Sequence, residues 1–111
     1  MAKSSGSEWP NDDDGDVFRS LQSQGFDFSK PYQIDFNIDL TMKNESQVIV
    51  MAIRRKFPEA NIYIEDFEEP VYIRVAVNHL VEYEYVIVMQ QALTDLSSPW
   101  LGICESWGVL H

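Results

Sequence analysis

The chain has few of the residues from which small proteins usually build metal sites and covalent cross-links. It contains one cysteine, Cys104, and two histidines, His79 and His111, among 111 residues. A single cysteine excludes an internal disulfide, and we expect Cys104 to be a small buried side chain. Neither histidine has a cysteine or a second histidine at the spacing of a zinc site. The sequence therefore predicts no metal and no cofactor.

Motifs of common enzyme classes and long apolar runs are also lacking. The sequence has no glycine-rich phosphate loop and no nucleophile elbow, which favours a non-enzyme. It shows no signal peptide and no apolar stretch long enough to cross a bilayer, so it predicts a cytoplasmic protein. Residues 1–8 are small and polar, and they predict a disordered tail before a single domain over residues 9–111.

Basic residues are scarce. Lys and Arg number 8 against 18 Asp and Glu, which gives a net charge of -10. Such a field repels phosphate backbones, so we expect no direct nucleic-acid binding. It favours a basic partner, such as an Arg-rich protein segment, although solubility alone explains the same acidity.

What the chain does have is an acidic run, Asn11-Asp12-Asp13-Asp14-Gly15-Asp16. Asn11 is a good N-cap, and acidic residues are favoured in a first helical turn, so the run predicts a helix over about residues 12–24. A calcium loop instead requires a bidentate Glu at its twelfth position. Ser23 occupies that position when the count starts at Asp12, which excludes the template.

The rest of the chain alternates between strand and helix patterns. Two-residue alternation over residues 32–40 predicts a strand with one buried face, and helical spacing follows from Glu45 to Pro58. The later predicted elements are strands at 62–67 and 71–80 linked through 68–70, a helix at 82–96 and a strand at 100–110. This order is the ferredoxin-like βαββαβ pattern with an extra N-terminal helix, an α+β fold. We expect a four-stranded antiparallel sheet with helices on one face and the first strand at its edge.

The uncovered sheet face is the most interesting predicted surface. Aromatic side chains set among carboxylates suit a basic peptide through ion pairs and cation–π contacts. The alternatives to a binding face are a face that is simply exposed to solvent and a face that the N-terminal helix covers. The predicted polar face consists of Gln33, Asp35, Asn37, Asp39, Tyr63, Glu65, Phe67, Tyr72 and Arg74. The candidate partner-binding residues are Asp12, Asp13, Asp14, Asp16, Asp35, Asp39 and Trp107, and a core position is the alternative for Trp107.

Three short motifs resemble a known family. They are Asn-Asp-Asp-Asp-Gly-Asp at 11–16, Ser-Lys-Pro at 29–31 before Ile-Asp-Phe at 34–36, and Ser-Trp-Gly at 106–108. Together they resemble the regulator of ribonuclease activity B family, also called ribonuclease E inhibitor B-like proteins, over about residues 9–109. The family's closing segment often reads Asp-Gly-Trp-Gly, where this chain has Glu-Ser-Trp-Gly at 105–108. The resemblance implies a ferredoxin-like acidic regulator that binds the Arg-rich C-terminal region of ribonuclease E and restrains mRNA decay.

The leading hypothesis is thus a non-enzymatic protein-binding regulator whose partner is a basic protein segment of a ribonuclease. A small hydrolase or metal-dependent enzyme is the alternative, and it requires a deep pocket that joins His79 to several carboxylates. A structural homo-oligomer formed through the open sheet face is the third hypothesis. The sequence leaves the oligomeric state open.

Overall fold

The structure is a computed structural model that describes residues 9–40, 45–66 and 71–110. The predicted N-terminal tail at 1–8 and the predicted turn at 41–44 lie outside the described residues. The same holds for Phe67, the predicted link at 68–70 and His111.

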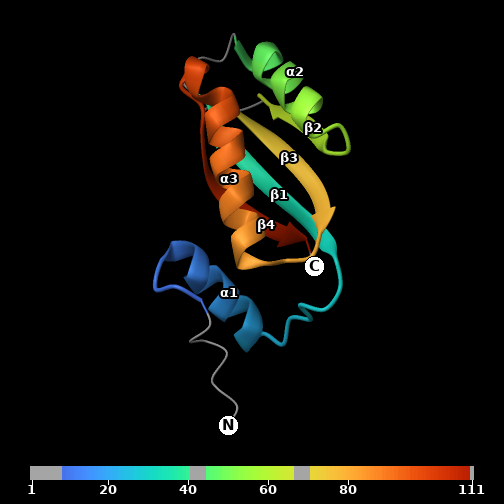
Figure 1. Ribbon diagram of the computed structural model, residues 1–111, viewed down its shortest axis with the longest axis vertical. Coiled ribbons are helices and arrows are strands. Elements are labelled where there is room, and N and C mark those ends of the chain that lie inside the picture. The colour runs from blue at the N-terminus through green and yellow to red at the C-terminus, as the bar shows by residue number, and fades with distance from the viewer. Residues whose placement is uncertain (1–8, 41–44, 67–70, 111) are drawn as a thin grey trace.

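The predicted order of elements is confirmed (Figure 1). The helices are α1 (Asp13–Ser23), α2 (Ser46–Lys56) and α3 (Tyr83–Ser97). The strands are β1 (Tyr32–Asp39), β2 (Asn61–Glu65), β3 (Tyr72–His79) and β4 (Ile103–Leu110). Strand β4 begins later than the predicted residue 100, because Ser98–Trp100 form a 3-10 turn and Leu101 takes a left-handed conformation with a φ of 63°.

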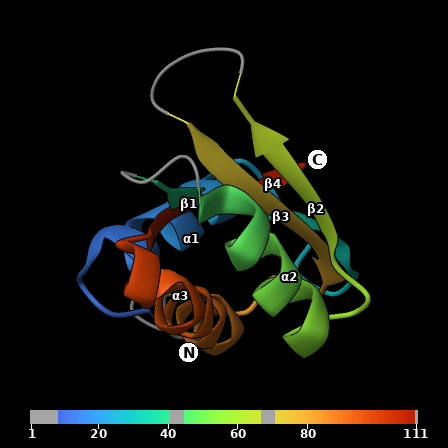
Figure 2. The same ribbon diagram turned by 90° about the horizontal axis from the view of Figure 1, so that it is seen from above.

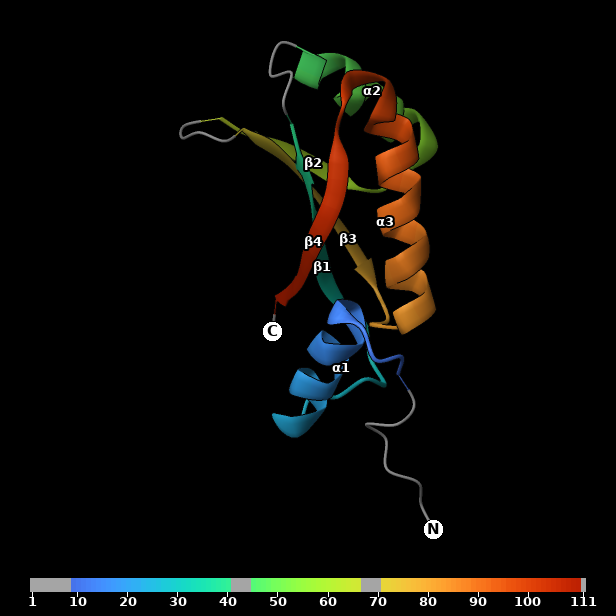
Figure 3. The same ribbon diagram turned by 90° about the vertical axis from the view of Figure 1, so that its left-hand side faces the viewer.

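The four strands form one antiparallel sheet in the order β2-β3-β1-β4. Helices α2 and α3 cover one face of this sheet, as predicted for the ferredoxin-like arrangement (Figures 2 and 3). The prediction that the first strand is an edge strand is wrong, since β1 pairs with β3 on one side and with β4 on the other. Alternation shows that one face of a strand is buried, but it carries no information about its neighbours.

The core lies between the sheet and the two covering helices. Ile34, Phe36 and Ile38 of β1 are fully buried on the helix side of the sheet. They form one apolar cluster with the inner faces of α2 and α3, which bury Ile49, Val50 and Ile53, and Val86, Met89 and Leu93. The alternating pattern of β1 and the helical spacing of α2 and α3 were therefore correct guides to the core.

A β-bulge in β4 decides which of its side chains enter the core. Asn37 of β1 lies opposite Ser106 and Ile38 lies opposite Cys104, so Glu105 has no opposite residue. The extra residue shifts the alternation, and both Cys104 and Trp107 point to the helix side. Cys104 is 5% exposed, which confirms the predicted buried side chain, and burial raises the pKa of its thiol to about 12.

Helix α1 lies beyond the end of the sheet, beside the start of α3, and does not cover the open sheet face (Figures 1 and 3). Its N-cap is Asp12, so the prediction of Asn11 as the cap is wrong. The Asp12 carboxylate accepts a hydrogen bond from the Gly15 N–H at 2.7 Å and a second from the Tyr83 hydroxyl. The contact with Tyr83 of α3 explains why Asp12, and not the equally suitable Asn11, is the N-cap.

Candidate partner-binding site

An aromatic cluster fixes α1 to the rest of the fold. Phe18 is 1% exposed and lies at the centre of this cluster. Its ring centroid lies 5.4 Å from Trp9, 6.0 Å from Phe28, 5.9 Å from Tyr83 and 5.4 Å from Trp107. These distances are typical of packed aromatic pairs, so α1 and the segment before it have a defined position on α3 and β4.

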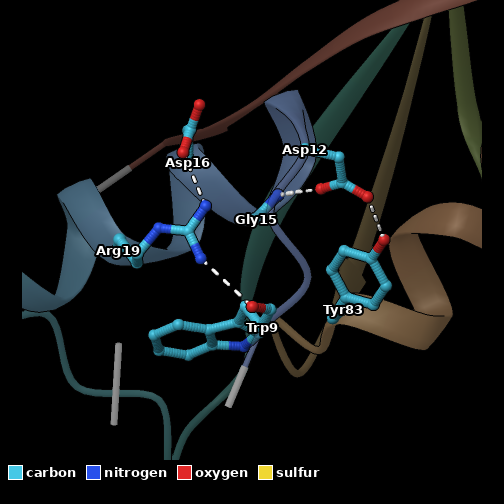
Figure 4. A network of polar contacts seen from close by, with 6 residues as sticks. All are labelled: Trp9, Asp12, Gly15, Asp16, Arg19 and Tyr83. Carbon is cyan, nitrogen blue, oxygen red and sulfur yellow. Dashed lines mark hydrogen bonds and ion pairs between the residues drawn. The ribbon is translucent and has the colours of Figure 1, made fainter. Parts of the chain in front are cut away.

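Three of the four aspartates of the acidic run make contacts within the protein. Asp12 caps α1 and accepts the Tyr83 hydroxyl at 2.6 Å, while Asp16 pairs with Arg19 at 2.5 Å (Figure 4). Asp14 is half-buried and accepts from the Trp107 indole N–H at 2.8 Å. Asp12 and Asp14 therefore fix α1 to α3 and β4, whereas the Asp16 pair lies within α1.

The contact between Asp12 and Tyr83 shifts the pKa values of both side chains. The Tyr83 hydroxyl, followed by the Gly15 N–H, stabilises the carboxylate and lowers the pKa of Asp12 below its usual 3.8. The same hydrogen bond raises the pKa of Tyr83 to about 12. The pair thus favours the folded state most strongly when Asp12 is ionised and Tyr83 is protonated.

Replacing Tyr83 with Phe is expected to lower the melting temperature and to do so in a pH-dependent way. The Asp12 carboxylate contributes above pH 3.8, and this contribution is lost as the pH falls further. The Tyr83 hydroxyl contributes below its usual pKa of 10.0, and this contribution is lost as the pH rises toward about 12. Thermal melts of both proteins should show a constant difference between these limits and a shrinking difference outside them. A difference that persists unchanged at both extremes would contradict the contact.

Two acidic residues that the sequence reasoning did not select join this region. Glu82 and Glu84 flank Tyr83 at the start of α3 and are exposed. Asp13 is exposed on α1, which the bond between Asp12 and Tyr83 holds against that part of α3. We call Asp12, Asp13, Asp16, Glu82 and Glu84 the α1–α3 acidic surface. Only the tertiary contact across 71 residues reveals it, since nothing in the local sequence at 82–84 distinguishes these glutamates.

The open sheet face carries the expected mixture of aromatic and acidic side chains, but it also carries its own cation. The Arg74 guanidinium lies 4.3 Å from the centroid of the Tyr63 ring. Its Nε donates to Glu65 Oε2 at 3.0 Å, and its Nη1 lies 3.9 Å from Asp35 Oδ2. The hydrogen bond to Glu65 raises the pKa of Arg74 further. The recognition chemistry predicted for this face is thus largely satisfied within the chain.

The structure does not bring all the candidate residues together. Asp14 accepts a hydrogen bond from Trp107 and therefore lies on the helix side of the sheet. Asp35 is half-buried on the opposite face, and Asp39 is exposed at the end of β1 on that same face. Trp107 is partly buried, packs against Phe18 and donates its indole N–H to Asp14. The seven candidates therefore fall into three groups, which are Asp12, Asp13 and Asp16 on the α1–α3 acidic surface, the bonded pair Asp14 and Trp107, and Asp35 and Asp39 on the open sheet face.

The requirement of the hydrolase alternative is not met at His79. The His79 ring stacks on Tyr85 with a centroid distance of 3.6 Å, beside a hollow of about 330 Å³. Glu59 is the one carboxylate among the described residues that line this hollow, where the alternative needs several. Within residues 9–40, 45–66 and 71–110, no three His, Cys, Asp or Glu side chains are grouped to hold a metal ion. No helix in this described part of the chain has the length and apolarity needed to cross a membrane.

The fold and the site define an acidic ferredoxin-like domain that presents carboxylates around a fixed N-terminal helix. A family model described as "Regulator of ribonuclease activity B" matches residues 11–109, nearly the whole chain. The chain belongs to this family. A comparison with curated proteins gives no significant match. The family membership confirms the resemblance drawn from the acidic run, the Ser-Lys-Pro segment and the Ser-Trp-Gly segment.

Proposed function

We propose that this protein is a non-enzymatic cytoplasmic regulator that binds a basic segment of a ribonuclease and so restrains RNA turnover. The observation that carries the proposal is the family match over residues 11–109. The proposal further holds that the protein has no direct contact with nucleic acid, which agrees with its net charge of -10.

The distribution of charge supports a protein partner of opposite sign. Arg19 is paired with Asp16, and Arg74 is paired with Glu65 and Asp35. By contrast, Asp13, Glu82 and Glu84 are exposed and form no ion pair with another described residue. A segment rich in arginine would therefore meet carboxylates that are available at the α1–α3 acidic surface, where Asp13 is the strongest of the original candidates.

The test is a cleavage assay with two forms of the ribonuclease, one carrying its basic segment and one lacking it. We expect this protein to slow RNA cleavage by the first form and to leave the second unchanged. The affinity for the isolated segment should fall about tenfold between about 50 and 200 mM salt, because exposed charge pairs are screened. Equal inhibition of both forms, or binding that ignores salt, would contradict the proposal.

A further inference from the structure

A hollow of about 500 Å³ lies between the segment that leads into α1 and the start of α3. It is lined by Trp9, Pro10, Glu82, Tyr83 and Glu84. The two sides of the hollow are fixed to each other by the hydrogen bond from Tyr83 to Asp12 (Figure 4). Both aromatic rings also pack on Phe18. The described lining thus combines two aromatic residues, whose rings are held in place by Phe18, with two exposed acidic residues.

The same combination binds a guanidinium elsewhere in this protein. On the open sheet face, Arg74 lies over the Tyr63 ring and contacts the Glu65 and Asp35 carboxylates. The hollow repeats this set of one cation–π surface and two acids, with a second aromatic ring added. None of the described residues that line the hollow is basic. Arg19 is bonded to Asp16 and to the carbonyl oxygen of the lining residue Trp9.

We propose that this hollow binds an arginine side chain of the basic segment, with the guanidinium against Trp9 and Tyr83 and its charge balanced by Glu82 and Glu84. This inference rests on the proposed function and adds to it the site and the residue type recognised. A planar guanidinium stacks on aromatic rings and bonds carboxylates in a fork, whereas a lysine ammonium is a strongly hydrated point charge. The hollow therefore selects arginine over lysine.

The open sheet face and the hollow beside His79 are less suited to this ligand. The aromatic and acidic groups of the open sheet face already contact Arg74. The hollow beside His79 includes Lys56 among its lining residues, and a like charge disfavours a cation there. The hollow at Trp9 also needs little rearrangement, because its rings are held by Phe18, and a preformed site loses less entropy on binding.

The test compares two charge-matched double variants of the full chain. In Glu82→Gln/Glu84→Gln, both acids of the hollow lose their charge while the side chains keep their shape. The control, Asp66→Asn/Asp95→Asn, removes the same two charges at exposed positions, one after β2 and one near the far end of α3. Melting temperatures of both variants verify that each is folded.

The probes are a Gly-Arg repeat peptide of about eight residues and the corresponding Gly-Lys peptide, titrated at about 50 mM salt. We expect the wild type to bind the arginine peptide at least about threefold more tightly than the lysine peptide. The hollow variant should lose about fivefold or more in affinity for the arginine peptide, and the control less than about twofold. In Trp9→Leu, the preference for arginine over lysine should fall toward one.

The outcomes separate this inference from the function on which it rests. If the wild type binds neither peptide, the proposed basic partner itself is wrong. If the wild type binds but the hollow variant and the control lose affinity equally, the site is wrong and the proposed function stands. The assignment of arginine to the hollow is wrong if the wild type binds the two peptides with equal affinity. It is also wrong if folded Trp9→Leu keeps the preference for arginine.

Discussion

Replacing Phe18 with Ala is expected to lower the free energy of unfolding by about 3–5 kcal/mol. Phe18 is 1% exposed and contacts aromatic rings from the segment before α1, from α3 and from β4. The surrounding rings come from different elements with fixed backbones, so they are poorly able to collapse into the space that the missing ring leaves. The lost aromatic contacts add to the cost of the cavity.

Urea unfolding of the wild type, Phe18→Ala and Phe18→Leu measures this effect. The leucine variant keeps most of the apolar volume and should lose much less stability than the alanine variant. Amide exchange in Phe18→Ala should rise most in α1, because Phe18 provides the aromatic packing of α1 against α3 and β4. A loss below about 1 kcal/mol for the alanine variant would show that α1 does not depend on this cluster.

Replacing Gly15 with Ala is expected to destabilise the protein by about 1–3 kcal/mol, although the same change usually stabilises a helix. Gly15 is buried in the first turn of α1. A Cβ atom there would lie 2.0 Å from the Pro10 carbonyl oxygen and 3.1 Å from Asp12 Oδ1. The nearer atom belongs to the backbone, so the segment before α1 has to shift to make room.

Gly108→Ala is the matched control, since a Cβ at Gly108 has no atom within 4 Å. It should leave stability unchanged or raise it by up to about 1 kcal/mol, because glycine in a strand interior is unfavourable. The denaturant midpoint of Gly15→Ala is therefore expected to fall, whereas that of Gly108→Ala should stay the same or rise. A neutral Gly15→Ala variant would mean that the close approach of Pro10 is not required for folding. The shift of Trp9 and Pro10 in Gly15→Ala should also weaken binding at the hollow that they line.

The fold class was predictable because its signals are local. The alternation of β1, the helical spacing of α2 and the length of α3 each depend on a few neighbouring residues. Their predicted bounds agree with the structure to within a residue or two at most ends, although β4 begins three residues later than predicted. Short connections and right-handed crossovers then leave few arrangements for the order βαββαβ.

The candidate site was predictable only in part. The acidic run was correctly predicted to begin a helix, because negatively charged side chains are stabilised at a helix N-terminus. Its roles were not visible in the sequence, because Asp14 meets Trp107 across 93 residues and Asp12 meets Tyr83 across 71. The aromatic and acidic sheet face was also identified from alternation, but the pairing of Arg74 with Glu65 and Asp35 depends on the geometry of neighbouring strands.

By itself, the sequence determined an acidic α+β domain, because net charge, alternation and helical spacing are properties of composition and of near neighbours along the chain. Only the tertiary structure decided that β1 is an inner strand, that the bulge at Glu105 turns Trp107 inward, and that Trp9 and Tyr83 face a common hollow with Glu82 and Glu84. Each of these depends on contacts between residues far apart in the chain, and such contacts form only when several elements pack at once.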